Sequence, residues 1–260
     1  MEDALAARSG NVAAVLACST FGVPPAAAQR AAWENAARAA DVALLVDSAA
    51  GFGATADDGQ VLGRQGDVEV FSFHATKPFA IGEGGLATTS DDKIARRMTR
   101  LANFGFVSGV VDGDVGLNAK LPEWSAATAL AVLDGYGDVL ARRRADAGRM
   151  VAELDEYGYQ RQSGTEGAAW QFVPVLAPSP AVRTAALATT RRDEIEVRTY
   201  FSVPLHRMPA FASVPIAGGL QRTEDLAERV LSLPMANDLA PGDIDAIVAS
   251  LISAVDVAPE

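Results

Sequence analysis

Lysine, histidine and cysteine are all scarce in this chain of 260 residues. Of its 22 basic residues only Lys77, Lys93 and Lys120 are lysines, and it has two histidines and one cysteine. A single cysteine excludes a disulfide within the chain and a thiolate metal cluster, and two histidines leave little material for a transition-metal site. The thiol of Cys18 ends an apolar run, so we expect it to be buried.

The sequence also lacks a surplus of positive charge and a long apolar run. Its net charge of −11 argues against a broad basic face for nucleic acid, although a local anion pocket needs only a few donors. No stretch is long enough to span a bilayer. The acidic start, Met1-Glu2-Asp3, does not have the order of a signal peptide. We therefore expect no nucleic-acid partner and no membrane partner, with the cytoplasm as the default compartment.

The first part of the chain alternates short apolar strands with a helix. An alanine-rich helix is expected over 26–40, opened by Pro25. The run 42–46 is apolar throughout, which is typical of a strand covered on both faces. The four strands predicted for this part lie near 11–17, 42–46, 68–73 and 85–89. Strands that alternate with helices predict an α/β fold here.

Helices dominate the remainder of the chain. A long helical region covers about 122–157, and further strands and helices follow it. The strands are expected over 169–177 and 194–201, and the helices over 180–190, 221–232 and 243–255. This order predicts a large α/β domain over 1–135 and a small α+β domain over 136–260.

Asp47 and Lys77 follow neighbouring predicted strands. Open α/β sheets bind ligands at the carboxyl ends of their strands, so both groups could face one crevice. A carboxylate there needs a partner such as a cationic ring nitrogen, and a lysine can form a Schiff base. Ser72 lies five residues before Lys77 and could donate to a phosphate. On spacing alone, a turn residue and a solvated lysine are the more common interpretations.

Five segments, in order along the chain, carry a more specific signal. They are VDSAAGFGA (46–54), FSFHATKPFAIGEGGLATT (71–89), GLNAKLPEWSAA (116–127), VRTYFSVPLHRMPAF (197–211) and VLSLPM (230–235). They closely resemble motifs of the DegT/DnrJ/EryC1/StrS family of sugar aminotransferases. That family consists of pyridoxal 5'-phosphate (PLP) enzymes of fold type I. The resemblance runs from about residue 10 to the C-terminus.

The resemblance implies a role for four residues. Lys77 matches the lysine that holds PLP as a Schiff base and moves the proton during catalysis. Asp47 matches the aspartate that binds the pyridine nitrogen, and Ser72 matches a phosphate-binding serine. Asn118 matches an asparagine that reaches the phosphate of the neighbouring subunit. The active unit implied is a homodimer with shared active sites.

The reaction implied is the transfer of an amino group, usually from glutamate, to a nucleotide-linked keto sugar in deoxysugar biosynthesis. An aminotransferase that acts outside sugar chemistry stays an alternative, since the same cofactor residues serve many acceptors. Lysine at position 77 argues against the dehydratase relatives, which have histidine there. His206 resembles a histidine near the substrate mouth, with substrate contact and a structural role equally open. His74 is expected to form structural hydrogen bonds.

The chain departs from the family at its front and at Ala50, where many members have glutamine or histidine. Family members begin with a long segment that this chain does not match, which holds a phosphate-binding loop and an aromatic that stacks on the cofactor. The four strands that remain would be contiguous with two open edges, which invite pairing with another chain. A misassigned start, a front supplied by a second polypeptide, and a non-catalytic homologue or assembly partner are the alternatives.

Overall fold

A computed structural model describes residues 1–6, 12–111 and 113–259. The chain divides into two compact units, one formed by 1–140 with 166–169 and the other by 141–165 with 170–260. The first unit contains a four-stranded and a two-stranded sheet, and the second contains a three-stranded sheet. The domain boundary expected from the sequence, between 135 and 136, stays a prediction.

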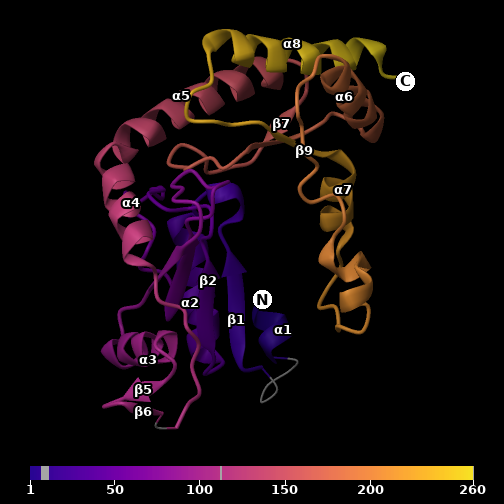
Figure 1. The fold of residues 1–260 in the computed structure, drawn as a ribbon. Helices are drawn as coiled ribbons and strands as arrows, with labels where there is room; N and C mark the ends of the chain where they lie inside the picture. The colour runs from indigo at the N-terminus through magenta and orange to yellow at the C-terminus, as the bar shows by residue number, and fades with distance from the viewer. Residues whose placement is uncertain (7–11, 112, 260) are drawn as a thin grey trace. The chain divides into compact units, whose positions relative to one another are not determined.

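A four-stranded sheet forms the centre of the first unit (Figure 1). Its strands are β1 (Ala14–Cys18), β2 (Ala43–Asp47), β3 (Val68–Ser72) and β4 (Gly85–Thr88), in that order across the sheet. The first three strands are parallel, and β4 runs antiparallel to β3. The four contiguous strands predicted from the sequence are confirmed. Among the described strands, β1 and β4 form the two edges.

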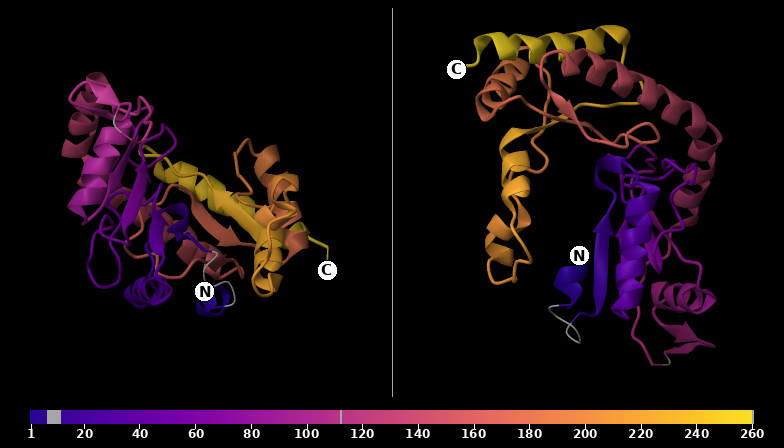
Figure 2. Two further views of the ribbon diagram at one scale, coloured as in Figure 1. Left: turned by 90° about the horizontal axis from the view of Figure 1, so that it is seen from below. Right: turned by 180° about the vertical axis from the view of Figure 1, so that it is seen from behind.

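One face of this sheet is covered. Helix α2 (Ala27–Ala39) packs against β1 and β2 (Figure 2). An apolar cluster of Ala17, Ala37, Leu44 and Val46 forms the contact. The small alanine side chains let the helix lie close to the sheet, because they fill little space between the two layers.

Aromatic rings fill the core farther along the sheet. The rings of Phe52, Phe71, Phe73, Phe79 and Tyr136 pack together with centroids 4.7–5.8 Å apart. The Tyr136 hydroxyl donates to the Phe52 carbonyl at 2.7 Å. Most of these ring pairs meet at steep angles, which is a favoured geometry of aromatic contacts.

The opposite face of the sheet is exposed. Leu16 of β1 leaves 70% of its surface accessible, and Leu45 of β2 and Val70 of β3 are also exposed. The prediction that β2 is covered on both faces is therefore wrong for the described part of the chain. We call this surface the open face. Its exposed apolar residues are Ala14, Leu16, Ala43, Leu45, Val70 and Ala87.

Short elements and helices complete the first unit. They are α1 (Glu2–Ala6), the 3-10 turn η1 (Thr20–Gly22), α3 (Asp92–Ala102), the hairpin strands β5 (Phe106–Val107) and β6 (Val110–Val111), and α4 (Glu123–Asp134). The Asp91 side chain caps α3 by accepting from the amides of Lys93 and Ile94. Helix α5 (Tyr136–Asp155) begins in this unit and continues into the second.

The second unit contains a three-stranded antiparallel sheet and several helices. Its strands are β7 (Gln160–Arg161), β8 (Val173–Leu176) and β9 (Val230–Leu233), in the order β7-β8-β9. Its helices are α6 (Pro180–Arg192), α7 (Gln221–Arg229) and α8 (Pro241–Val257), and two 3-10 turns, η2 (Leu205–Arg207) and η3 (Pro209–Phe211), precede α7.

Two sequence predictions in this unit are wrong. The segment 194–201 was expected to be a strand, but its described pairing is an isolated bridge between Arg198 and Ser232. Residues 230–232 were expected to end a helix, but they belong to β9, whose four residues are all buried beside β8. A short apolar run fits a strand or a buried helix equally well, so periodicity alone does not decide between them.

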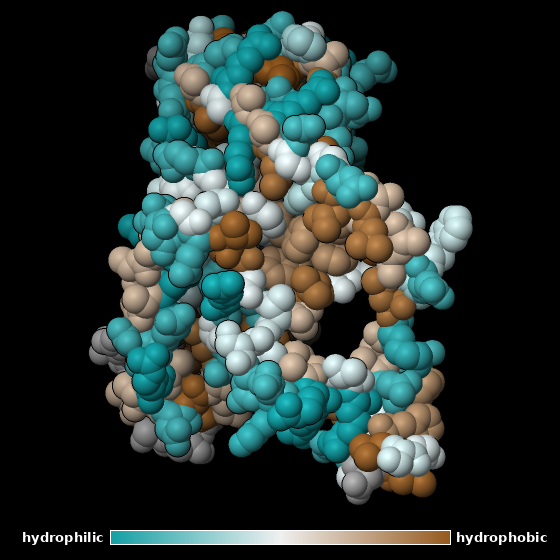
Figure 3. Space-filling model, turned by 90° about the vertical axis from the view of Figure 1, so that its left-hand side faces the viewer, coloured by the Kyte–Doolittle hydropathy of each residue, from teal (hydrophilic) through white to brown (hydrophobic). Residues whose placement is uncertain are grey.

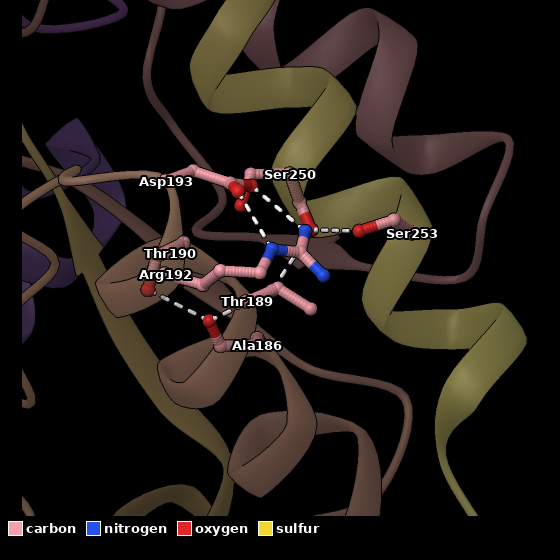
Figure 4. Close-up of polar contacts among 7 residues, drawn as sticks. All are labelled: Ala186, Thr189, Thr190, Arg192, Asp193, Ser250 and Ser253. Carbon is pink, nitrogen blue, oxygen red and sulfur yellow. Dashed lines mark hydrogen bonds and ion pairs between the residues drawn. The ribbon is translucent and has the colours of Figure 1, made fainter.

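Helices α6 and α8 pack side by side and are joined by polar contacts (Figure 4). The Thr189 hydroxyl lies 3.1 Å from the Ala186 carbonyl and 3.0 Å from the Ser250 carbonyl, so it links the two helices. Arg192 and Asp193 pair at the end of α6. Of the helices that the described residues form, none combines the length and apolar character needed to cross a membrane.

Candidate active site

The carboxyl ends of β1, β2 and β3 bring three polar side chains to one edge of the open face. Cys18 is the register partner of Asp47, and Asp47 is the partner of Val70. Partners on adjacent strands point to the same face, as do residues two apart on one strand. Cys18, Asp47 and Ser72 therefore line one edge of the sheet on its open face.

Asp47 is half-buried at the end of β2 and is held by its neighbours. Its carbonyl accepts a hydrogen bond from the Ser19 amide at 2.8 Å. Its Oδ1 atom accepts from the Ala49 amide at 2.9 Å. The second contact orients the side chain, while a carboxylate has capacity for further donors.

Lys77 lies in a loop that leaves β3 and returns as β4. Backbone hydrogen bonds of 2.8–3.0 Å close this loop, from Phe73 to Gly84, from Ala75 to Gly82 and from Ile81 to Phe73. The Lys77 amide donates to the His74 carbonyl at 2.9 Å. The loop that carries the lysine is therefore a hydrogen-bonded turn rather than an open connection.

The surroundings of Lys77 favour its neutral amine. Burial lowers the pKa of its ammonium below the ordinary value, while the charges of Asp47 and Cys18 act in the opposite direction. Asp47 ends β2, and the loop that carries Lys77 follows β3, the parallel neighbour of β2, so both residues lie at the carboxyl end of these strands.

Cys18 corrects a sequence prediction, because it is exposed and not buried. The protein around its sulfur still raises the pKa of the thiol by desolvation, and the Asp47 charge adds to this. A hydrogen bond from the Thr20 hydroxyl and the charge of Lys77 act in the opposite direction. The sequence offered one signal that Cys18 belongs to the site, which is its position at the end of a strand.

Ser72 and His74 shape the start of the lysine loop. Ser72 ends β3, donates its amide to the Ala49 carbonyl at 3.1 Å and accepts from the His74 amide at 3.3 Å. The His74 ring bonds Thr76, with Nδ1 3.0 Å from Oγ1 and 3.2 Å from the amide nitrogen. These contacts stabilise the turn and agree with the structural role expected of His74.

Asn118 and His206 do not join this cluster by any described contact. Asn118 is exposed and forms an isolated bridge with Asn103. His206 belongs to the second unit, where its Nε2 lies 2.6 Å from Glu224 Oε1. Arg207 bonds the same carboxylate, and hydrogen bonds from His206 and Arg207 hold the pKa of Glu224 below its ordinary value.

Within 1–6, 12–111 and 113–259, no group of three or more histidine, cysteine, aspartate or glutamate side chains could hold a metal ion. The cluster instead offers an amine, a carboxylate and a hydroxyl near one edge of a parallel sheet. The amine can form a Schiff base with a carbonyl group, the carboxylate can pair with a cation, and the hydroxyl can donate a hydrogen bond.

Two proteins of known sequence show what the chain is similar to. Protein Rv3402c of Mycobacterium tuberculosis is 36% identical over 244 residues, which cover 93% of this chain and 59% of that protein. The dTDP-4-amino-4,6-dideoxy-D-glucose transaminase of Shigella dysenteriae is 29% identical over 214 residues, which cover 80% of this chain and 58% of the enzyme. The chain thus spans less than two thirds of the length of these relatives.

Solved structures agree on the fold. The structure of DesI with its TDP-sugar product matches with a TM-score of 0.87 and 31% identity, covering 99% of this chain and 66% of DesI. The mixed α/β fold is that of the PLP-dependent aminotransferases of fold type I, as the sequence predicted. The model of the DegT/DnrJ/EryC1/StrS aminotransferase family matches residues 1–252, and the chain belongs to this family.

Proposed function

We propose that this chain carries the cofactor-binding residues of a PLP-dependent sugar aminotransferase. The reaction proposed moves an amino group from an amino acid, glutamate by preference, to the carbonyl carbon of a nucleotide-linked keto sugar. The donor leaves as a keto acid and the acceptor as an amino sugar. The observation that carries the proposal is that half-buried Asp47, at the end of β2, and half-buried Lys77, in the loop after the parallel strand β3, lie at the same carboxyl end of the sheet.

The side chains present fit three functional groups of PLP. Asp47 offers a carboxylate for the pyridine nitrogen, Ser72 a hydroxyl for the phosphate, and Lys77 an amine for the aldehyde. The edge of the open face that they share is accessible, since Cys18 beside Asp47 is exposed. When bound, PLP supplies an electron sink for the carbon that gains or loses nitrogen.

Each residue then has a definite task. The Asp47 carboxylate keeps a proton on the nitrogen that it contacts, because an ionised acid stabilises a neighbouring cation. Burial lowers the pKa of Lys77, so its Nζ can act as the nucleophile that holds the cofactor and as a base that accepts and returns a proton. The Ala49 amide keeps the Asp47 carboxylate oriented for this role.

A titration of the purified chain with PLP tests the proposal. We expect the visible absorbance of lysine-bound PLP to appear in the wild type and to be absent in Lys77→Ala. Lys93→Ala is the matched control, since Lys93 is an exposed lysine at the start of α3. The acceptor class is then tested by supplying glutamate with dTDP- or UDP-linked keto sugars. Mass spectrometry measures the loss of glutamate and the gain of amino sugar. A wild type that shows no band at saturating PLP would refute catalysis by this chain alone.

The active unit that we propose is a homodimer, in which Asn118 contributes to the phosphate site of the second copy. The exposed surface of α4 supports this. Trp124 leaves 84% of its surface accessible, and Leu130 and Leu133 are exposed on the same helix. Figure 3 looks onto the left-hand side of Figure 1, where α4 is drawn, and apolar residues are visible on that face. Apolar patches of this kind mark protein–protein contacts, and sedimentation equilibrium measures the resulting mass.

The open face of the sheet favours a second candidate function. Its apolar residues would be covered if another polypeptide segment packed on them, and Leu16 is more accessible than Leu45 or Val70. In that case the chain is a non-catalytic homologue or an assembly partner. It would then aggregate alone or copurify with a partner chain. A folded homodimer of this chain loaded with PLP would refute the second candidate.

A further inference from the structure

A carboxylate lies fully buried in the middle of β3. Glu69 exposes 0% of its surface, and its partner across the ladder is Val46 of β2. Because side chains alternate along a strand, Glu69 points away from the open face that carries Asp47. Glu69 therefore cannot touch a ligand bound beside Asp47, and any effect on that ligand must pass through other residues.

Four neutral donors surround the Glu69 carboxylate. Its Oε2 atom accepts from the amides of Gly63 at 2.7 Å and Gln65 at 3.0 Å. Its Oε1 atom accepts from Gln65 Nε2 at 3.0 Å and from the Ser48 hydroxyl at 2.5 Å. An ionised carboxylate can accept about four hydrogen bonds, so these four donors replace the water that Glu69 loses on burial and no counter-ion is needed.

One of these donors belongs to the end of β2. Ser48 follows Asp47 directly and is fully buried. Its hydroxyl also lies 3.1 Å from the hydroxyl of Ser19, which follows Cys18 at the end of β1. The Ser19 amide donates to the Asp47 carbonyl at 2.8 Å. Hydrogen bonds thus connect Glu69 through Ser48 and Ser19 to the backbone of Asp47, and Ser19 directly follows Cys18 in the chain.

We propose that Glu69 is a positioning residue for the candidate cofactor site. Through the Ser48 hydroxyl it holds the carboxyl ends of β1 and β2, and so keeps the Asp47 side chain beside Cys18 and Lys77. The role toward PLP rests on the proposed function, but the placement of Asp47 does not. A residue that only stabilised the fold would lower stability without moving Asp47.

Two variants separate these roles, because each removes one donor from the same oxygen atom of Glu69. Ser48→Ala removes the link to the end of β2. Gln65→Met removes the Nε2 donor, which has no connection to β2, and also removes a buried Oε1 atom without a partner among the described residues. Glu69→Gln is a third variant, which keeps the shape of the side chain and replaces one acceptor by a donor.

The thiol of Cys18 reports on the position of Asp47 without any cofactor. It is the single cysteine of the chain, and the charged groups that act on it are Asp47, which raises its pKa, and Lys77, which lowers it. If Asp47 moves away, the thiol pKa falls and more thiolate is present at pH 7.5. We expect iodoacetamide to alkylate Cys18 on the order of threefold faster in Ser48→Ala and Glu69→Gln, equivalent to about half a pKa unit. Gln65→Met should react at the wild-type rate.

PLP affinity is the second readout. Equilibrium dialysis should show binding weakened about fivefold in Ser48→Ala and Glu69→Gln, the size expected from losing one net hydrogen bond, and unchanged in Gln65→Met. Wild-type thiol reactivity in both variants, alongside a lowered melting temperature, would overturn the proposal. Because the thiol readout needs no ligand, a wild type that fails to bind PLP would refute the proposed function and leave this result standing on its own.

Discussion

Phe79 connects the stability of the first unit to the lysine loop. It lies two residues after Lys77, is only 3% exposed, and its ring contacts those of Phe52, Phe73 and Tyr136 at centroid distances of 4.7, 4.8 and 5.0 Å. Replacing a buried phenylalanine by alanine costs about 3–5 kcal/mol, from lost burial and from the cavity that is left. We expect Phe79→Ala to lose about 4 kcal/mol, because three ring contacts are removed together.

Urea denaturation followed by circular dichroism measures this loss. Phe106→Ala is the matched control, because Phe106 is an exposed phenylalanine of β5 and its removal should cost less than about 1 kcal/mol. Phe79→Leu refills most of the space and should recover more than half of the loss. In native buffer, Lys77 of Phe79→Ala should also form its Schiff base with PLP more slowly than Lys77 of the wild type, because the loop loses the packing of the Phe79 ring. A loss within about 1 kcal/mol of that of Phe106→Ala would refute this description of the core.

Three further predictions follow from other parts of the molecule. Burial raises the pKa of the Tyr159 hydroxyl from 10.0 to about 12, so the unfolded chain loses this proton first and the stability should fall as the pH rises from about 10 to about 12. Thermal melts of Tyr159→Phe should not show this decline. At pH 7 the same variant should lose about 1 kcal/mol, because the hydrogen bond to the Leu251 carbonyl is missing. Asp47→Asn should bind PLP about tenfold more weakly, with an unchanged melting temperature, because an amide does not hold a proton on the ring nitrogen; equal affinity in a dialysis assay would contradict the role of Asp47. Saturating PLP should slow the alkylation of Cys18, measured by the intact mass of the protein. An alkylation rate that does not depend on PLP would place the cofactor elsewhere than beside Asp47 and Lys77.

The sheet of the first unit could be predicted from the sequence because its strands are short, apolar and separated by clear turns. Their order follows once the chain is recognised as a family member. Asp47 and Lys77 lie at the same end of the sheet because the carboxyl ends of parallel strands share one edge. The exposure of Leu16 and Leu45 could not be predicted, because an apolar run shows that a strand can be covered but not what covers it.

The polar interior was also beyond the reach of sequence reasoning. In the segment 68–73, Glu69 alternates with Phe71 and Phe73, so period two places the carboxylate on the same face as two core rings. A carboxylate on an apolar face is stable only because hydrogen-bond donors reach it, from Ser48 and from the loop at 63–65. Ser48 is distant in sequence, and the loop has no regular secondary structure that a pattern could predict. The local pattern therefore gives the face of Glu69 but neither its burial nor its partners.

Covalent trapping tests the central claim most directly, because the chain has three lysines at which PLP can be fixed. The wild type is incubated with PLP at pH 7.5, reduced with borohydride, digested and mapped by peptide mass spectrometry. The account predicts one phosphopyridoxyl group per chain on Lys77, the half-buried lysine whose pKa is lowered. Label spread over Lys77, Lys93 and Lys120 in proportion to exposure, or no label at saturating PLP, would contradict it.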